Sequence, residues 1–309
     1  MKSTTLAAAL LVGLAATPAL AVDWAAVPGK DVTLFYPGQS SWEWVQSGAD
    51  HGGAGKIRSG KVCRECHVSE EKEMGNTLVL GKKNEPTPPA GKPGSIEAVI
   101  KFAIEKDSLL VHLDFKEGTQ PDAKMDPDFA TKVTMMLGDA KVGESMQAGC
   151  WGTCHEDAAK MPAAGTAERT KYLTRTRAKP TRNGGGDELK PAEDLAQMQA
   201  DGQVLEYWQA RLKPGAAAVA AAGTVFDKRQ EAKAGVVSAQ AVQTDGGWSV
   251  TLSRKLSATA PFKELAEGKT YGVGFAIHSG HTARRFHYVS LEHVLAIGQG
   301  TADFVAVKK

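Results

Sequence analysis

Two short cysteine segments, each followed at once by a histidine, carry the residue types best suited to chemistry in this 309-residue chain. Residues 63–67 read CRECH, a complete C-x-x-C-H motif, and residues 150–155 read CWGTCH, in which three residues separate the cysteines. The C-x-x-C-H spacing is typical of covalent haem attachment, in which two thiols bond to the haem and the adjacent imidazole reaches the iron. Cys150 and Cys154 lie four positions apart, close to one helical turn, so both thiols can still face the same way.

The same four cysteines leave two other interpretations open. Two cysteine pairs with histidines also describe a tetrahedral zinc site, and four cysteines in an exported chain permit three disulfide pairings. Haem accounts for more of the pattern, because it uses all four cysteines and gives both following histidines the same role. We therefore predict two covalently bound haems c. Their predicted attachment residues and proximal ligands are Cys63, Cys66 and His67 for haem one, and Cys150, Cys154 and His155 for haem two.

A six-coordinate iron needs a second axial ligand, and three further histidines are the leading candidates. His51 lies in the polar, glycine-rich stretch DHGGA, twelve residues before Cys63, which is a poor setting for a core histidine. We prefer it as the distal ligand of haem one. His278 follows the strand-like run YGVGFAI, and His287 lies near the start of the next run, RFHYVS. Two histidine ligands give low-spin iron with no open position.

The first 21 residues have the pattern of a secretory signal peptide. A lysine at position 2 precedes a short apolar run that ends in Ala-Leu-Ala before Val22. No later segment reaches the 18 or so consecutive apolar residues of a membrane-spanning helix, so we predict a periplasmic protein without a membrane span after cleavage. Without Lys2 the chain keeps 36 of its 37 Lys and Arg residues against 35 Asp and Glu. This near balance argues against a nucleic-acid partner.

Short apolar segments with two-residue alternation predict a mainly β protein, an antiparallel β-sandwich with helical and loop insertions that carry the two c-type haem sites. Hairpin turns are expected at 105–108 and 245–247, and a helix over 191–212. We expect a single haem-binding domain over 22–309, with an N-terminal haem segment at about 34–94 and a helical insertion at about 163–214. The predicted strands are 98–104, 109–115, 132–137, 236–242, 248–254, 271–277 and 286–290.

Several short blocks resemble a known family. WSV at 248–250, SRKL at 253–256, the run 268–277 and HYVS at 287–290 are similar to the haem-binding domain of the gamma subunits of ethylbenzene dehydrogenase and dimethyl sulfide dehydrogenase. LFYPGQ at 34–39 and the run 149–162 resemble the multihaem c-type cytochrome branch of that family. The resemblance implies an antiparallel β-sandwich that binds haem and carries electrons for molybdenum enzymes.

The resemblance also bears on the distal ligand of haem two. In the gamma subunits the haem is not covalently attached, its ligands are methionine and lysine, and the lysine lies just before a Val-Ser pair on a late strand. His287 occupies the matching position here, and His155 takes the place of the methionine. The resemblance therefore implies His287 as the distal ligand of haem two, with His278 as the alternative for either iron, and both haems bis-histidine and low-spin.

The expected function is single-electron transfer in the periplasm by a dihaem c-type cytochrome that performs no substrate chemistry of its own. The expected partners are redox proteins: a membrane quinol oxidase, a soluble reductase or a molybdoenzyme. A function of another class stays open, in which one haem has an open or weakly held position and the protein is a haem enzyme, such as a peroxidase, or a sensor of gas or redox state.

Overall fold

The computed structural model describes most of the chain beyond the predicted leader. The described residues are 22–40, 42–49, 51–83, 85, 87–150, 152, 172–179 and 188–309. The predicted signal peptide, Cys154 and His155 lie outside them. Of the helical insertion expected at 163–214, the residues 163–171 and 180–187 also lie outside.

The described residues fold mainly into β-strands, which confirms the fold class predicted from the sequence. All strands belong to one thirteen-stranded sheet whose hydrogen-bonded path runs β7-β6-β5-β4-β10-β11-β1-β2-β3-β9-β8, with β12 and β13 joining β10 to β2. The strands are β1 (Gly29–Phe35), β2 (Ser95–Glu105), β3 (Ser108–Lys116), β4 (Thr131–Gly138), β5 (Leu205–Leu212), β6 (Val219–Val225), β7 (Arg229–Glu231), β8 (Ser238–Thr244), β9 (Gly247–Lys255), β10 (Thr270–His278), β11 (Tyr288–Val289), β12 (His293–Ile297) and β13 (Phe304–Lys308).

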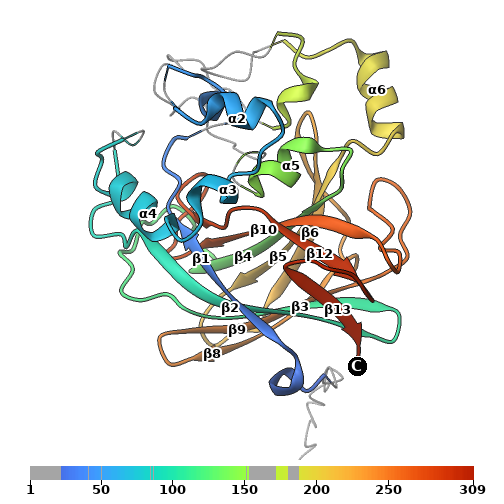
Figure 1. Ribbon diagram of the computed structural model, residues 1–309. Coiled ribbons are helices and arrows are strands. Elements are labelled where there is room, and N and C mark those ends of the chain that lie inside the picture. The colour runs from blue at the N-terminus through green and yellow to red at the C-terminus, as the bar shows by residue number, and fades with distance from the viewer. Residues whose placement is uncertain are drawn as a thin grey trace, which may run out of the picture.

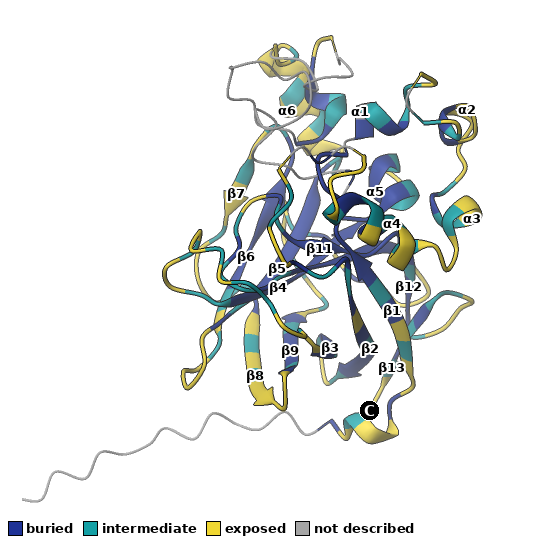
Figure 2. Ribbon diagram, turned by 90° about the vertical axis from the view of Figure 1, so that its left-hand side faces the viewer, coloured by how far each residue is buried: buried dark blue, intermediate teal, exposed yellow. Residues whose placement is uncertain are grey.

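The sheet folds over so that its two ends pack face to face. Arg254 on β9 forms an ion pair with Glu206 on β5 at 2.7 Å, and its guanidinium lies 5.4 Å from the ring centre of Trp208. Trp208 is fully buried between the layers. Burial of apolar surface in this interior is the main force that holds the layers together. In Figure 2 the buried residues follow the strands in both layers, and exposed residues dominate the outer edge at β8.

The helices gather at one end of the sandwich, above the ends of β1, β4 and β10 (Figure 1). Most are short, so tertiary packing rather than helix propensity must stabilise them. They are α1 (Trp42–Val45), α2 (Ala54–Arg58), α3 (Arg64–His67), α4 (Glu71–Val79), α5 (Gly143–Ala148) and α6 (Ala192–Ala200), with 3₁₀ turns η1 (Trp24–Ala26) and η3 (Thr174–Thr176). No helix among the described residues is long and apolar enough to cross a membrane.

The helix predicted over 191–212 is wrong in its second half. Helix α6 ends at Ala200, and Gly202 then adopts a φ of +76°, which only glycine takes readily. The following residues form β5, which pairs with β4 on one side and β6 on the other. Seven of the eight residues of β5 are buried although they include Glu and Gln, so the strand lacks the alternation that marks a half-exposed strand.

Both predicted hairpins are present, and the sheet also contains strands that the sequence pattern did not indicate. Glu105 pairs with Ser108 across the β2–β3 turn, and Thr244 pairs with Gly247 across the β8–β9 turn. β13 pairs in parallel with β12 and β2, although an antiparallel sheet was expected throughout. The strand predicted at 286–290 shrinks to the two residues of β11.

Candidate haem sites

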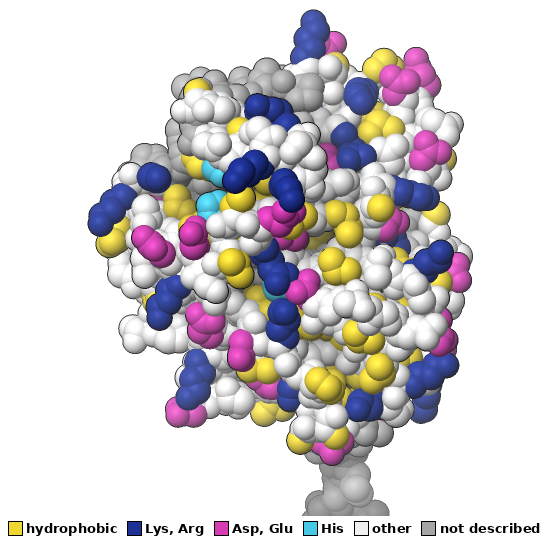
Figure 3. Space-filling view, in the orientation of Figure 1, with side chains coloured by type: hydrophobic (Ala, Val, Ile, Leu, Met, Phe, Trp, Pro, Cys, Tyr) yellow, Lys and Arg dark blue, Asp and Glu magenta, His cyan; other side chains and the backbone are white. Residues whose placement is uncertain are grey.

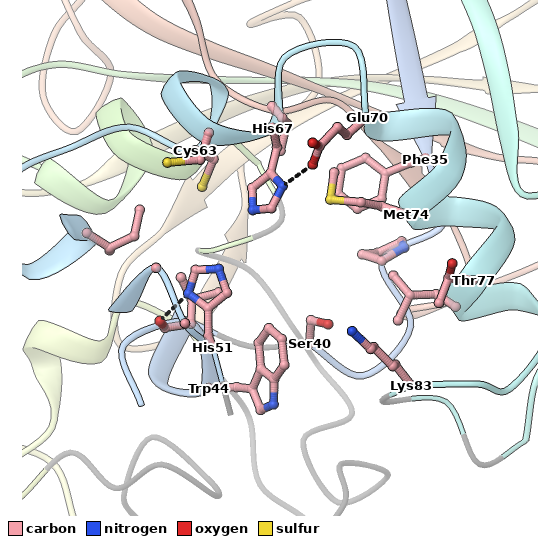
Figure 4. Close-up of a pocket in the computed structure, with 18 of the residues that line it drawn as sticks. Phe35, Ser40, Trp44, His51, Cys63, His67, Glu70, Met74, Thr77 and Lys83 are labelled. Atoms are coloured by element: carbon pink, nitrogen blue, oxygen red, sulfur yellow. Dashed lines mark hydrogen bonds and ion pairs between the residues drawn. The ribbon is translucent and has the colours of Figure 1, made fainter. Parts of the chain in front are cut away.

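The first C-x-x-C-H motif lines a cavity of about 440 Å³ between the helices and the end of β1. Cys63 precedes α3, and Cys66 and His67 lie on it; all three line this cavity, here called cavity one. His51 reaches the same cavity from the turn before α2, as Figure 4 shows. The structure therefore brings together all four residues predicted for haem one.

The separation of the two histidines suits an iron between them. The ring centres of His51 and His67 are 6.0 Å apart. A bond from a metal to an imidazole nitrogen is about 2 Å long, and that nitrogen lies about 1 Å from its ring centre, so two imidazoles on opposite sides of one metal have ring centres about 6 Å apart. The residues of cavity one therefore fit a bis-histidine haem.

Hydrogen bonds fix which nitrogen each ring presents to the cavity. Nδ1–H of His51 donates to the carbonyl oxygen of Val45 at 2.8 Å, and Nδ1–H of His67 donates to Oε2 of Glu70 at 2.8 Å. In a neutral imidazole whose Nδ1 is protonated, Nε2 carries the lone pair that binds a metal. In Figure 4 the second nitrogen of each ring points toward the other ring. Both side chains are thus oriented as ligands of one metal.

Three residues of cavity one were not singled out from the sequence. The ring of Trp44 lies 5.6 Å from that of His51, Glu70 binds His67, and Met74 lines the wall beside Glu70. Glu70 follows His67 by three positions, but α3 ends at His67 and Ser69 then adopts a φ of +63°, so the contact depends on this turn and not on a continuous helix. Helical spacing alone therefore could not have predicted it. Trp44 and Met74 look like ordinary core residues in the sequence.

Cavity one opens at the surface of the molecule. Side chains of histidine are visible there, bordered by Lys and Arg on one side and by Asp and Glu on the other (Figure 3). The His67 side chain keeps 31% of its surface exposed. A group bound between the two histidines therefore lies close to solvent, where another protein can approach it.

A second cavity of about 440 Å³ brings together the described residues predicted for haem two. Cys150, His278 and His287 all line this cavity, here called cavity two, together with Met136 on β4 and Tyr207 on β5. Cys154 and His155 lie outside the described residues, so the structure does not test their positions. The two cavities thus separate His51 from the other two distal candidates.

His278 and His287 are too close together to hold one iron between them. Their rings stack with centres 4.7 Å apart and planes at 28°. Both donate to the carbonyl oxygen of Arg284 at 2.8 Å, His287 through Nδ1–H and His278 through Nε2–H. Burial, and the neighbouring His287, lower the pKa of His278 well below its ordinary value. His278 is therefore neutral, and the two rings present different nitrogens to the cavity.

Helix α5 connects the two cysteine segments. The backbone N–H of Cys63 donates to the carbonyl oxygen of Gln147 at 2.9 Å, three residues before Cys150. The side-chain amide of Gln147 donates back to the carbonyls of Ile57 and Lys61 at 2.8 Å each. These bonds tie the segment that leads to cavity two to the segment that lines cavity one.

Glycine on β10 allows the second cysteine segment to lie directly on the sheet. A Cβ at Gly274 would come within 2.3 Å of the backbone nitrogen of Cys150, so any side chain there would push the segment away. A glycine inside a strand often marks such a close approach of another backbone. The position of Cys150 beside cavity two thus depends on the sequence of β10.

The structure also bears on the two other interpretations of the cysteines. The three described cysteines, Cys63, Cys66 and Cys150, form no disulfide with one another. Within the described ranges, no three residues among His, Cys, Asp and Glu gather as a bare metal ion would require. The pairing of His51 with His67 across an open cavity instead suits a flat group with an iron at its centre.

Comparisons with known proteins find one family model and two cytochromes c that the chain resembles. A family model described as ethylbenzene dehydrogenase matches residues 190–290. The chain is 33% identical over 316 residues to cytochrome c-552 of Stutzerimonas stutzeri, with 100% of both chains covered. It is 29% identical over 289 residues to cytochrome c-551 of Rhodocyclus tenuis, covering 94% of this chain and all of that one.

A solved structure of a family 9 carbohydrate-binding module from Caldicellulosiruptor kristjanssonii in complex with cellotriose also matches. It covers 64% of this chain and 65% of that one at 10% identity. Its TM-score is 0.29, which is too low to support a conclusion about fold or ligand.

Proposed function

The chain belongs to the family of c-type cytochromes that includes cytochrome c-552 of Stutzerimonas stutzeri, and from that premise we propose that it is a periplasmic dihaem carrier of single electrons. Family membership supports covalently bound haem c and a role in electron transfer. The two haems, their ligands and the location are the proposal. Haem one is assigned to Cys63, Cys66, His67 and His51, and haem two to Cys150, Cys154, His155 and His287.

The facing pair of His51 and His67 is the observation that carries this proposal. Their Nε2 atoms are held toward each other by hydrogen bonds on the opposite side of each ring. A haem held in this way supplies a one-electron couple at an iron with both axial positions filled. Such a site favours electron transfer over binding of a substrate or gas.

The geometry of cavity two supports His287 over His278 as the distal ligand there. His287 donates through Nδ1, as His51 and His67 do, and so presents Nε2. His278 donates through Nε2 and would have to bind through Nδ1, which lies next to Cγ, the ring carbon that leads through Cβ to the residue's own backbone. Binding through Nδ1 would bring that backbone against the haem. Since the two rings are only 4.7 Å apart, the proximal ligand must be another residue, and His155 is proposed.

The link through α5 supports electron transfer between the two haems. The backbones of Cys63 and Gln147 are hydrogen-bonded, and Cys150 is three residues farther along the chain. The proposed attachment points therefore lie in one packed unit. Electrons that enter at the exposed edge of cavity one would pass to haem two or return to a redox partner. The proposed partners are a quinol oxidase in the membrane, a soluble reductase or a molybdoenzyme.

An intact mass measurement of the exported protein tests the proposed function. The expected mass is that of a chain that begins at Val22 and carries two haems. EPR of the same oxidised protein should show low-spin signals only. A mass with one haem or none would contradict the dihaem carrier. A high-spin haem that binds carbon monoxide when reduced would also contradict it and would favour an enzyme or a sensor. A Cys150→Ser and Cys154→Ser double variant should lose one haem and keep the signal of haem one.

Single alanine variants of the two stacked histidines should have different spectra. In His287→Ala, haem two is expected to lose its distal ligand and become high-spin, because His278 presents the wrong nitrogen. In His278→Ala, haem two is expected to stay low-spin. EPR of the oxidised variants measures both. The assignment is wrong if His287→Ala keeps two unshifted low-spin haems while His278→Ala does not.

A further inference from the structure

Glu70 makes a contact with His67 that depends on the turn between two helices. Its Oε2 accepts the Nδ1–H of His67 at 2.8 Å. Ser69, between them, adopts a φ of +63°, and this reverses the chain where α3 ends and α4 is about to begin. The turn places a carboxylate against the ring that is proposed as the proximal ligand of haem one.

The contact at Nδ1 of His67 differs from those at the same atom of His51 and His287. Nδ1–H of His51 donates to the carbonyl oxygen of Val45, and Nδ1–H of His287 donates to that of Arg284. A carboxylate attracts the imidazole proton more strongly than a neutral carbonyl does. The hydrogen-bond partner of a ligating histidine fixes its tautomer and raises its basicity. His67 should therefore donate more electron density through Nε2 than either of the other two rings.

We propose that Glu70 is a positioning residue that lowers the reduction potential of haem one. This inference rests on the proposed function, because His67 must carry the iron of haem one. A more basic ligand stabilises the ferric state, and the partners of the axial ligands are among the features that set haem potentials.

The test compares Glu70→Gln with Glu73→Gln in the haem-loaded protein. Glu73 lines the same cavity and carries the same charge, but it is not hydrogen-bonded to His67. In a potentiometric titration followed by EPR, Glu70→Gln is expected to raise the potential of haem one, to shift its low-spin g values and to leave haem two unchanged. Glu73→Gln is expected to cause a smaller rise and no shift in g values.

Two results would overturn the inference. Equal rises in both variants would mean that charge alone acts, and an unchanged potential in Glu70→Gln would mean that the contact has no effect. The Glu70 side chain is 53% exposed, so neither variant is expected to impair folding. Failure of the proposed function would look different, because unaltered Cys63 and Cys66 would then carry no haem in the intact mass of the wild-type protein.

Discussion

In the haem-loaded protein with His51 replaced by alanine, haem one is expected to change from low-spin to high-spin iron and to bind carbon monoxide when reduced. His51 is the imidazole that faces His67 at 6.0 Å, and its Nδ1 bond to Val45 holds it there. Alanine leaves that side of the iron without a histidine, and the potential of haem one should shift. Visible absorption, EPR and carbon monoxide titration measure the change. Added imidazole should restore the low-spin spectrum.

His112→Gln provides a matched control for the loss of a histidine. His112 lies on β3, stacked 4.5 Å from the ring of Trp24 and hydrogen-bonded to Thr251 at 2.8 Å, and it lines neither cavity. Both haems should stay low-spin in this variant. If His51→Ala also keeps two low-spin haems without added imidazole, another residue binds haem one. Met74, on the wall of the same cavity, would then be the first residue to replace.

The sequence predicted features correctly where they depend on residues that are close together in the chain. The spacing of Cys63, Cys66 and His67 brings them to one wall of cavity one through a single turn of α3. The polar glycines around His51 correctly indicated a residue outside the core. Strand β2 alternates between buried and less buried residues over much of its length, and the strands predicted at 98–104, 109–115 and 248–254 lie within the observed bounds of β2, β3 and β9.

What could not be predicted depends on pairing between distant segments. β5 is recognisable as a strand only once β4 and β6 flank it, because its own residues are almost all buried. The residue pattern alone did not separate His278 from His287, and only the family resemblance favoured His287. Only the shared carbonyl of Arg284 distinguishes their tautomers, and that carbonyl is positioned by a turn without a regular pattern.

A buried ion pair next to this turn should have the largest effect on stability. Arg285 pairs with Glu85, and both side chains are almost completely buried. Tyr36 donates to Glu85 at 2.5 Å, and burial raises the pKa of Tyr36, so its hydroxyl stays protonated. In Glu85→Leu, the free energy of unfolding is expected to fall by about 3 to 5 kcal/mol, because Arg285 keeps its charge in the interior and loses the carboxylate of Glu85. Guanidinium unfolding followed by circular dichroism measures the loss.

The control breaks an ion pair that is exposed at the surface and not buried. Asp107 and Lys255 pair on the surface, with more than 60% of each side chain exposed. Asp107→Asn should leave the free energy of unfolding almost unchanged, because water already screens that pair. Adding Arg285→Met to Glu85→Leu should recover most of the loss, since the unpaired charge is then removed. A loss below about 1 kcal/mol in Glu85→Leu would mean that Arg285 has found another partner or water.

The position of this ion pair extends the prediction from stability to haem two. Arg285 directly follows Arg284, whose carbonyl holds the rings of His278 and His287. Tyr36 follows Phe35, which lines cavity one. If the pair anchors the turn that orients His287, Glu85→Leu should broaden the low-spin EPR signal of haem two more than that of haem one. Equal broadening would mean that the pair stabilises the sandwich as a whole without orienting the ligand.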